Sequence, residues 1–376
     1  MRIAVNTRFL LKSKLEGIGW FTFEVVRQLV INNPQHEFIF LFDRPFDEEF
    51  IFAKNIKPVV VSPPARHPLL WYMWFEWSVP FILKRHKVDL FFSPDGYLSL
   101  SSKVPSVVVM HDLAFEHHPE DVGGLVSKFY RYFTPRYAKK AARILTVSEF
   151  TKKDIHQLYD VTLDNIDVVY NGVNNAFAPV STTISTEIKK AYALDNEFFV
   201  YVGALHPRKN IKRLFEAFDQ FKKETNSTTK LVIVGRKAWS VAEIENTYNQ
   251  MQFKDEVVFT GRLGSEDLRK VIASAKALTY VPYFEGFGIP IIEAQKCETA
   301  VITSNITSMP EAAGDGALLV DPYNVGSIVN ALKIIDSDEQ FRQDLIAKGI
   351  QNVQRFSWEK TAEKVWRGLM KVVNNE

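Results

Sequence analysis

The sequence has 376 residues, too many for one ordinary hydrophobic core and about right for two domains. Hydrophobic residues make up 46% of the chain and charged residues 24%, which is typical of a globular rather than a disordered protein. The net charge of +2 provides no strong field for nucleic-acid binding, and the single cysteine, Cys297, excludes an internal disulfide.

The first residues, MRIAVNTRFL, have an apolar run too short for a signal peptide and typical of a first strand. No stretch approaches the roughly 18 apolar residues of a membrane-spanning helix, so we expect a cytoplasmic protein. Two segments dense in aromatic and basic residues, LLWYMWFEWSVPFILKRHK (69–87) and SKFYRYFTPRYAKKAAR (127–143), could touch the cytoplasmic face of a membrane. Both segments also fit ordinary packed helices with a basic edge.

Short β-rich runs alternate with helical stretches along the chain, an order that indicates parallel sheets. In the first part, strands are expected at residues 3–5, 38–42, 57–61, 90–92, 107–110, 144–147 and 166–169. In the second part, they are expected at residues 198–202, 231–234, 257–259, 277–281, 300–303 and 317–320. The helices expected between them include residues 20–30, 129–142, 211–225 and 265–274.

The two series of strands are separated by residues 171–186, which are rich in Asn, Ser, Thr and Pro and are expected to form a linker. We therefore predict an α/β protein with two facing Rossmann-like domains, residues 1–178 and residues 179–356. Ligands of parallel sheets bind at the carboxyl ends of the strands, so the two domains would share an interdomain cleft.

The segment YFEGFGIPIIEA (283–294) follows a predicted strand and places seven residues between Glu285 and Glu293. Gly286 and Gly288 would let the backbone approach a ligand closely, and the following helix start offers unpaired N–H groups to an anion. Glu285 precedes the helix and can point into the cleft, whereas Glu293 lies in its first turns, where the helix dipole also favours a carboxylate. A simple loop–helix junction explains the pattern equally well.

A second candidate is YVGALHPRKN (201–210), in which a predicted strand ends at Gly203 and Arg208 and Lys209 come just before a helix. An arginine fork, a lysine point charge and a helix N-terminus together suit a diphosphate. The alternative is solvated surface charge.

In LEGIGWFTFEVV (15–26), Gly17 and Gly19 precede an amphipathic helix. The pattern is half of a dinucleotide fingerprint, but Thr22 stands in place of the third glycine. A glycine loop that approaches a phosphate or sugar is one interpretation, and a plain turn before a helix is the other.

In VVVMHDLAFEHHPE (107–120), His111 and Asp112 lie at a strand's carboxyl end, where the histidine could donate a hydrogen bond to a sugar hydroxyl or phosphate. His117 and His118 are adjacent, which is the wrong spacing for a shared metal-ligand face.

An acidic D-x-D triplet, Asp336-Ser337-Asp338, has the form of a divalent-metal motif for a nucleotide diphosphate. It lies between two helical patterns, and Ser337 with Gln340 fits a capping box. We therefore predict no metal site.

In their order and spacing, these motifs resemble glycosyltransferase family 4, a family of retaining enzymes with the GT-B fold, over nearly the whole chain. The resemblance rests on GIGWF (17–21), MHDLAFEHHPE (110–120), TVSEFTKKDI (146–155), VVYNGVN (168–174), YVGALHPRKN (201–210), FTGRLGSEDL (259–268), EGFGIPIIEA (285–294) and MPEAAGDGALLVDP (309–322). It implies an acceptor-binding first domain, a donor-binding second domain, and a final helix at about 357–376 that packs back on the first domain.

The resemblance also implies a role for each candidate residue. Glu285 would orient the transferred sugar, and His111 would contact that sugar near the reacting carbon. The donor's diphosphate and sugar would be bound by Gly17, Gly19, Gly203, Arg208, Lys209, Gly286, Phe287 and Gly288. Glu293 would bind the ribose, Arg262 and Leu263 would lie beside the base, and Asp112 would face the acceptor.

The sequence departs from the family's pattern at two places. Many members carry an arginine directly after the glycine of the donor loop, where this chain has Ala204. After the second glutamate the family often reads A-C-G-x-P, whereas residues 296–300 read KCETA, so that the glycine and the proline of that turn are both lost.

The activity implied is transfer of a hexose from a nucleotide-sugar to an acceptor hydroxyl, with retention and without a metal or other cofactor. The pattern looks most like bacterial mannosyltransferase-like members that build surface polysaccharides, which favours GDP-mannose first, a UDP-hexose second, and a glycan or lipid-linked acceptor. Two alternatives stay open: a nucleotide-sugar epimerase with the same two-domain architecture, and a non-catalytic nucleotide-sugar binding protein.

Overall fold

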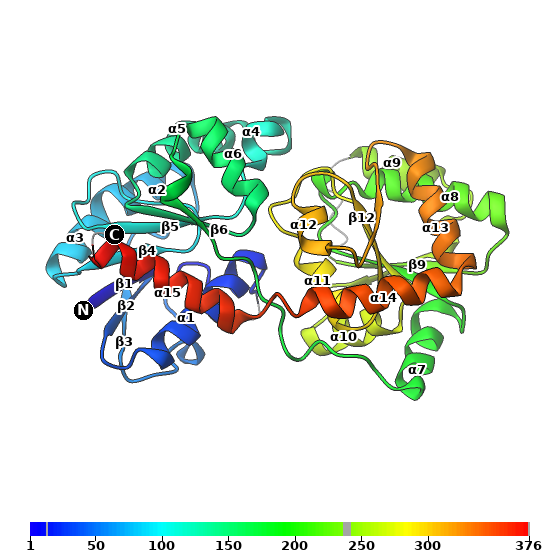
Figure 1. Ribbon diagram of the computed structural model, residues 1–376. Coiled ribbons are helices and arrows are strands. Elements are labelled where there is room, and N and C mark those ends of the chain that lie inside the picture. Colours follow the sequence, from blue (N-terminus) through cyan, green and yellow to red (C-terminus); the bar gives the residue numbers. More distant parts are fainter. Residues whose placement is uncertain (13, 236–241, 375–376) are drawn as a thin grey trace. The chain divides into compact units, whose positions relative to one another are not determined.

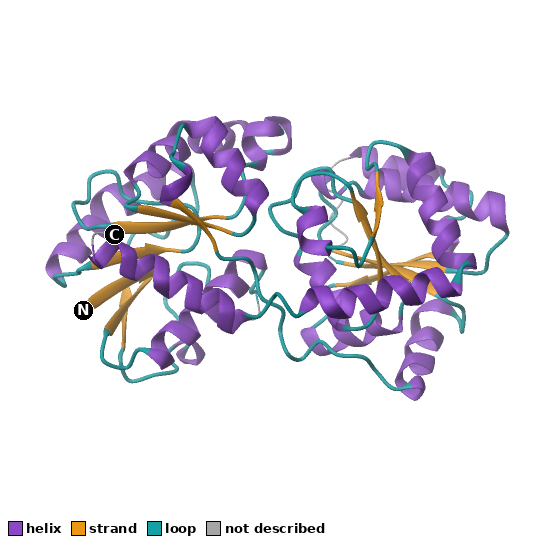
Figure 2. Cartoon of the chain, in the orientation of Figure 1, coloured by secondary structure: helices purple, strands orange, loops and turns teal. Residues whose placement is uncertain are grey.

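The computed structural model describes residues 1–12, 14–235 and 242–374. The chain forms two compact units, one made of Met1–Gly172 with Ser357–Glu376 and the other of Val173–Phe356. Each unit contains one parallel sheet with helices packed on it (Figures 1 and 2). The predicted α/β class with two Rossmann-like sheets is therefore confirmed.

The first unit has a seven-stranded sheet in the order β3-β2-β1-β4-β5-β6-β7. Because the strand order reverses beside β1, the carboxyl ends of β1 and β4 form the switch point at which such sheets bind ligands. The strands are β1 (Arg2–Asn6), β2 (Glu37–Phe42), β3 (Ile56–Val60), β4 (Leu90–Ser93), β5 (Ser106–Met110), β6 (Arg143–Thr146) and β7 (Ile166–Val168).

Helices cover both faces of this sheet, with α1 and α15 side by side on one face and α2, α5 and α6 on the other (Figure 1). The helices are α1 (Gly17–Asn32), α2 (Pro68–Met73), α3 (Val79–Arg85), α4 (Ala114–His117), α5 (Gly124–Lys140), α6 (Glu149–Tyr159) and α15 (Trp358–Asn374). Shorter helical segments are η1 (Glu48–Phe50), η2 (Trp74–Ser78), η3 (Pro119–Asp121) and η4 (Leu163–Asn165). The final helix is held by an ion pair between Lys371 and Asp167 at 3.1 Å.

The second unit has a six-stranded sheet in the order β10-β9-β8-β11-β12-β13, with its switch point between β8 and β11. The strands are β8 (Phe198–Val202), β9 (Lys230–Val234), β10 (Val257–Gly261), β11 (Ala277–Tyr280), β12 (Ala300–Ser304) and β13 (Leu318–Val320). The helical segments are α7 (Thr182–Ala193), η5 (Pro207–Lys209), α8 (Ile211–Thr225), α9 (Ala242–Gln250), η6 (Lys254–Glu256), α10 (Ser265–Ser274), α11 (Ile289–Lys296), α12 (Met309–Ala313), α13 (Val325–Ser337) and α14 (Glu339–Val353).

The start of α7 and the cap of α14 differ from the sequence-based expectation. Helix α7 begins inside the stretch expected to be a linker, because the Ser181 side chain caps it by accepting a hydrogen bond from the Ile184 N–H. The cap of α14 is Asp338, which accepts from the Phe341 N–H at 2.9 Å, and not Ser337 as predicted. Across the described ranges, no helix has the length and apolar character needed to cross a membrane.

The turn after α11, where the family's glycine is missing, keeps a glycine-like backbone. Glu298 adopts φ +58°, in the left-handed region that residues with a Cβ atom avoid, and its side chain is exposed. The turn therefore survives the loss of glycine at the cost of local backbone strain.

We predict that Glu298→Gly raises the free energy of unfolding by about 0.5–1 kcal/mol, since glycine relieves the strain and only part of that gain is lost to its greater freedom in the unfolded chain. Urea denaturation of the full chain measures the difference. Glu298→Ala is the matched control, because it removes the carboxylate but retains the Cβ atom. Equal stability of the two variants would contradict the explanation.

Candidate active site

The strongest cluster of candidate residues lies where the neighbouring strands β8 and β11 reach their carboxyl ends. Lys209 on η5 forms an ion pair with Glu285, and its Nζ lies 5.1 Å from the ring centroid of Tyr280. The Tyr280 hydroxyl donates to Glu285 Oε2 at 3.0 Å, and Arg208 Nη1 lies 3.5 Å from Glu285 Oε1. The fold thus brings two cations to a carboxylate that follows Lys209 by 76 residues in the sequence.

The charge state of Glu285 follows from this arrangement. Burial alone would raise the pKa of its carboxyl, but Lys209 and Arg208, with the Tyr280 hydroxyl, lower the pKa to about 2. Glu285 is therefore a carboxylate at neutral pH, and both cations stay charged beside it. At neutral pH Glu285 therefore cannot donate a proton, but it can accept hydrogen bonds from hydroxyl groups.

The loop that carries Glu285 is held by side chains that sequence reasoning missed. Asn210 Nδ2 donates to the Val281 carbonyl at 3.0 Å and to the Pro322 carbonyl at 2.7 Å. The Ser308 hydroxyl donates to the backbone carbonyl of Glu285 at 2.7 Å. Asn210 directly follows the predicted Arg208–Lys209 pair, but its partners are distant in sequence and no local pattern reveals them.

Glycines allow the close contacts around this loop. Gly288 precedes α11 with φ +94°, and a Cβ atom there would lie 2.9 Å from Met309 Cε. Gly203 follows β8 with φ +149°, and a Cβ atom on Gly235, which follows β9, would lie 2.0 Å from the Gly203 carbonyl oxygen. Gly235 was not predicted, although the run LVIVG has the same strand-then-glycine form as YVG.

Gly286 and Phe287 lie in the same loop, and the buried Phe287 ring packs edge-on against Phe356 at 5.4 Å between centroids. Phe287 therefore anchors the loop through its side chain, and any ligand contact would have to come from its backbone.

Glu293 is partly buried on α11, and its carboxylate has no ion pair or hydrogen bond among the described residues. Burial raises its pKa to about 7. Arg262, which is exposed, and Leu263, which is partly buried, follow the edge strand β10. These residues and Glu285 all lie on segments that follow the carboxyl ends of strands in the same sheet.

In the first unit, His111 follows β5, and its ring packs edge-on against Phe21 at 5.0 Å between centroids. His111 Nε2 lies 2.8 Å from the Pro94 carbonyl oxygen, so this nitrogen carries the proton. Burial lowers the pKa of the ring, which leaves Nδ1 as an acceptor at neutral pH. With Nε2 engaged by Pro94, the ring nitrogen left for a ligand is Nδ1, which accepts a hydrogen bond, whereas the sequence predicts a donor.

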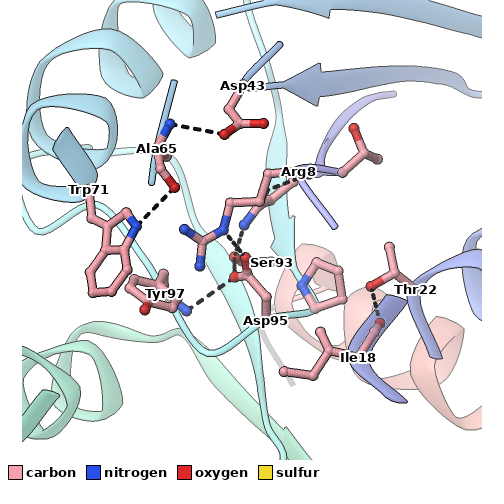
Figure 3. A network of polar contacts seen from close by, with 12 residues as sticks. Arg8, Ile18, Thr22, Asp43, Ala65, Trp71, Ser93, Asp95 and Tyr97 are labelled. Atoms are coloured by element: carbon pink, nitrogen blue, oxygen red, sulfur yellow. Dashed lines mark hydrogen bonds and ion pairs between the residues drawn. The ribbon is translucent and has the colours of Figure 1, made fainter. Parts of the chain in front are cut away.

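Next to Pro94 in the chain, a buried ion pair lies just after the ends of β1 and β4 (Figure 3). Arg8 Nε donates to Asp95 Oδ2 at 2.5 Å, and the guanidinium carbon lies 4.1 Å from the ring centroid of Tyr97. The Ser93 hydroxyl donates to Asp95 Oδ1 at 3.1 Å. Sequence reasoning missed Arg8 and Asp95, although both follow predicted strands just as His111 does.

The remaining candidates in the first unit are Gly17, Gly19 and Asp112. Helix α1 begins at Gly17, so Gly17 and Gly19 form its first turn and not a loop before it, as expected from the sequence. A Cβ atom on Gly19 would lie 3.0 Å from the Phe9 carbonyl oxygen, whereas Gly17 has open space around it. Asp112 accepts a hydrogen bond from the Ala114 N–H at 3.0 Å.

The two adjacent histidines are engaged with acids. His117 Nε2 lies 2.8 Å from Asp154 Oδ1, and His118 Nδ1 lies 3.2 Å from Glu120 Oε1. Asp336 of the D-x-D triplet accepts hydrogen bonds from Thr229 and Lys276. Within residues 1–12, 14–235 and 242–374, no group of three or more His, Cys, Asp or Glu side chains is arranged to hold a metal ion.

Two family models match the chain one after the other. The model for Glycosyltransferase Family 4 matches residues 15–177, and the model for Glycosyl transferases group 1 matches residues 184–352. The chain belongs to glycosyltransferase family 4. The resemblance seen in the motifs is thus confirmed.

Named relatives match this family 4 chain over most of its length. O-antigen chain mannosyltransferase B of Escherichia coli is 26% identical over 364 residues, which are 93% of this chain and 94% of the relative. O-antigen chain mannosyltransferase RfbU of Salmonella typhimurium strain LT2 is 27% identical over 327 residues, which are 86% of each protein.

Solved structures share the fold at low sequence identity. Sucrose-phosphate synthase of Thermosynechococcus elongatus gives a TM-score of 0.81 at 16% identity and covers 100% of both chains. WaaG, a glycosyltransferase of lipopolysaccharide biosynthesis, gives 0.76 at 15% identity, covering 96% of this chain and 98% of its own. The Anabaena protein HepE, solved with UDP-glucose, gives 0.78 at 16% identity, covering 99% and 100%. These likenesses confirm the GT-B fold.

The pKa of Glu285 makes a prediction about acid stability. Its value is lowered from 4.5 to about 2 on folding, so the stabilisation is present above the unfolded pKa and is lost as the pH falls from about 5 to about 2. We expect the stability difference between wild type and Glu285→Gln to shrink over that range by on the order of 3 kcal/mol. Urea denaturation at a series of pH values measures it, and a difference independent of pH would contradict the ion-pair account.

Proposed function

We propose that this family 4 enzyme is a retaining mannosyltransferase that moves mannose from GDP-mannose to a hydroxyl of a glycan or lipid-linked acceptor. The observation that carries the proposal is the cluster of Lys209, Arg208 and Glu285 at the ends of β8 and β11. The choice of mannose is supported by the two relatives named as O-antigen chain mannosyltransferases. A role in surface polysaccharide synthesis rests on the same names.

The cluster suits a donor diphosphate. Lys209 and Arg208 face one carboxylate in the free protein, and a diphosphate brings more negative charge than that carboxylate supplies. Its arrival would draw the two cations to the phosphate oxygens and leave Glu285 to accept hydrogen bonds from the sugar's hydroxyls. The amides from Gly286 to Gly288 and the start of α11 would add N–H donors.

The second unit would therefore hold the donor. Gly203 would let the backbone approach the diphosphate, Glu293 would accept hydrogen bonds from the ribose, and Arg262 and Leu263 would flank the base. In the first unit, Gly17 has the open space that a close ligand approach requires. His111 Nδ1 would accept a hydrogen bond from a hydroxyl of the sugar, and Asp112 would face the acceptor substrate.

The chemical step breaks the bond between the anomeric carbon and the leaving diphosphate and forms a bond from that carbon to the acceptor oxygen. Attack on the face that the phosphate leaves gives retention, and a phosphate oxygen takes the acceptor's proton. Lys209 and Arg208 would stabilise the charge that grows on the departing diphosphate, which is electrostatic catalysis by preorganised groups. We propose that no metal is needed, because these cations do the work of a metal.

We predict that Lys209→Met lowers kcat/KM by about 10²–10³-fold, the usual loss when one preorganised charge-stabilising donor is removed. GDP release and extension of octyl α-mannoside, with GDP-mannose as donor, are the measurements. Lys212→Met is the matched control, since Lys212 lies three residues further on and pairs with the exposed Glu243.

Several outcomes would overturn the proposed function. Epimerisation of GDP-mannose without acceptor would identify an epimerase, and tight binding without transfer to any acceptor would identify a binding protein. A UDP-hexose used in preference would change the donor. An inverted anomer in the product, read from its NMR coupling constant, would exclude retention.

The raised pKa of Glu293 predicts pH-dependent donor binding. The carboxyl is protonated below about pH 7 and must be ionised to accept hydrogen bonds from both ribose hydroxyls. We expect the affinity for GDP-mannose to rise by up to tenfold per pH unit, roughly, as the pH approaches 7 from below, and to level off above 7. Calorimetric titration tests this, because the donor's phosphates stay ionised throughout.

Glu293→Gln should bind the donor more weakly and with no dependence on pH between 6 and 8, roughly, since an amide does not titrate there. If the affinity of the wild-type protein for GDP-mannose does not change with pH, Glu293 does not bind the ribose.

A further inference from the structure

One surface of the first unit has a composition that the fold itself does not require. We call it the aromatic–basic face: the outward side of the continuous helical stretch α2–η2–α3 together with the outward side of α5. Its exposed apolar residues are Leu69, Tyr72, Trp77, Phe81, Leu125 and Tyr132. Its basic residues are Lys84, Arg85, Lys128, Arg136, Lys139 and Lys140.

The two helical stretches form one surface. Tyr72 of α2 packs against Trp77 at 6.1 Å and against Phe133 of α5 at 5.9 Å between ring centroids. Tyr132 in turn packs edge-on against Phe133 at 4.9 Å. Phe81 lies one helical turn beyond Trp77, which extends the same side of the helix.

The inward side of the same helices already meets the needs of the core. Trp71 Nε1 donates to the Ala65 carbonyl at 2.9 Å (Figure 3), and Trp74 Nε1 donates to the Val61 carbonyl at 2.9 Å. Trp77 and Phe81, by contrast, are 60% and 63% exposed. A helix that is apolar on all sides is normally buried all round, so the outward aromatics point to a second apolar phase.

The charges on this face have one sign. Helix α5 contains no Asp or Glu, and the only acid of α2–η2–α3, Glu76, accepts hydrogen bonds from the Leu100 and Ser101 N–H groups. Among the residues that the structure describes, no ion pair engages Lys84, Lys128 or Lys139. The Arg136 guanidinium lies 3.6 Å from the ring centroid of Tyr132, so an aromatic and a cation are presented together.

We propose that the aromatic–basic face binds the surface of an anionic lipid bilayer. Trp and Tyr side chains favour the headgroup level of a membrane, and each Lys or Arg near an anionic surface adds attraction. Protein interfaces are instead depleted in lysine, which argues against a protein as the partner of this lysine-rich face. The proposal goes beyond the proposed sugar transfer and does not depend on it.

Co-sedimentation of the full chain with vesicles tests the proposal. Vesicles of phosphatidylcholine with phosphatidylglycerol should bind the chain, and vesicles of phosphatidylcholine alone should bind it at least tenfold less, roughly, because the charge attraction is missing. Raising the salt from about 0.1 M to about 0.5 M should weaken the binding, since screening shortens the range of surface charges.

Two variants separate the apolar and charged parts. Trp77→Ser combined with Phe81→Ser should weaken binding at least tenfold, roughly, since two interfacial aromatics are lost. Lys128→Gln, Lys139→Gln and Lys140→Gln together should remove the preference for anionic vesicles. The matched controls are Leu163→Ser, at a residue 42% exposed elsewhere on the first unit, and Lys54→Gln, both of which should bind as wild type does.

The outcomes are distinct. Equal binding to both kinds of vesicle, equal losses in the controls, or full binding by Trp77→Ser with Phe81→Ser would each overturn the proposal. An absence of vesicle binding with self-association that the same double variant abolishes would show a protein interface instead. Thermal unfolding midpoints verify that each variant is folded. The vesicle experiment uses no nucleotide-sugar, so its failure leaves the proposed transfer untouched.

Discussion

The ion pair between Lys209 and Glu285 is the contact on which the candidate site depends. It joins the loop after β8 to the loop after β11, two neighbouring strands whose carboxyl ends meet only in the folded sheet. Leaving either charge buried without the other would be costly, because desolvation is repaid only when both partners are present. The pair therefore holds the site in order and keeps the charges that we assign to donor binding.

Each unit places a cation–carboxylate pair at the switch point of its sheet, partly buried in the second unit and fully buried in the first. In the second unit the pair is Lys209 with Glu285, and in the first it is Arg8 with Asp95. The Arg8–Asp95 pair is next to Pro94 in the chain, and the Pro94 carbonyl accepts a hydrogen bond from His111 Nε2. The hydrogen bond to Pro94 fixes the tautomer of His111 and leaves Nδ1 as the acceptor.

The helical stretch α2–η2–α3 packs against the core with one side and exposes aromatic residues on the other. The inward-facing Trp74 is buried and hydrogen-bonded, whereas Trp77 and Phe81 on the other side are exposed. Packing of the sheet explains the first set and leaves the second set without a role in folding. The same logic distinguishes Gly19, which is packed against the chain, from Gly17, which is open.

The sequence by itself was sufficient for the α/β class, the strands of both sheets and the family, because strand periodicity and motif order are local properties of the chain. It also identified Arg208, Lys209, Glu285 and His111 as candidates, since polar residues after predicted strands mark the edge where parallel sheets bind ligands.

Only the tertiary structure decided the partners of these candidate residues. The pairing of Glu285 with Lys209, the scaffold built by Asn210 and Ser308, and the link from Arg8 through Asp95 to His111 join distant segments. Local patterns also misplaced the start of α1 and the cap of α14, because a glycine can begin a helix as well as a turn and either of two adjacent polar side chains can cap one. The charge states of the two glutamates could not be predicted from the sequence either, because they depend on the folded surroundings. Neighbouring cations lower the pKa of Glu285, and burial raises that of Glu293.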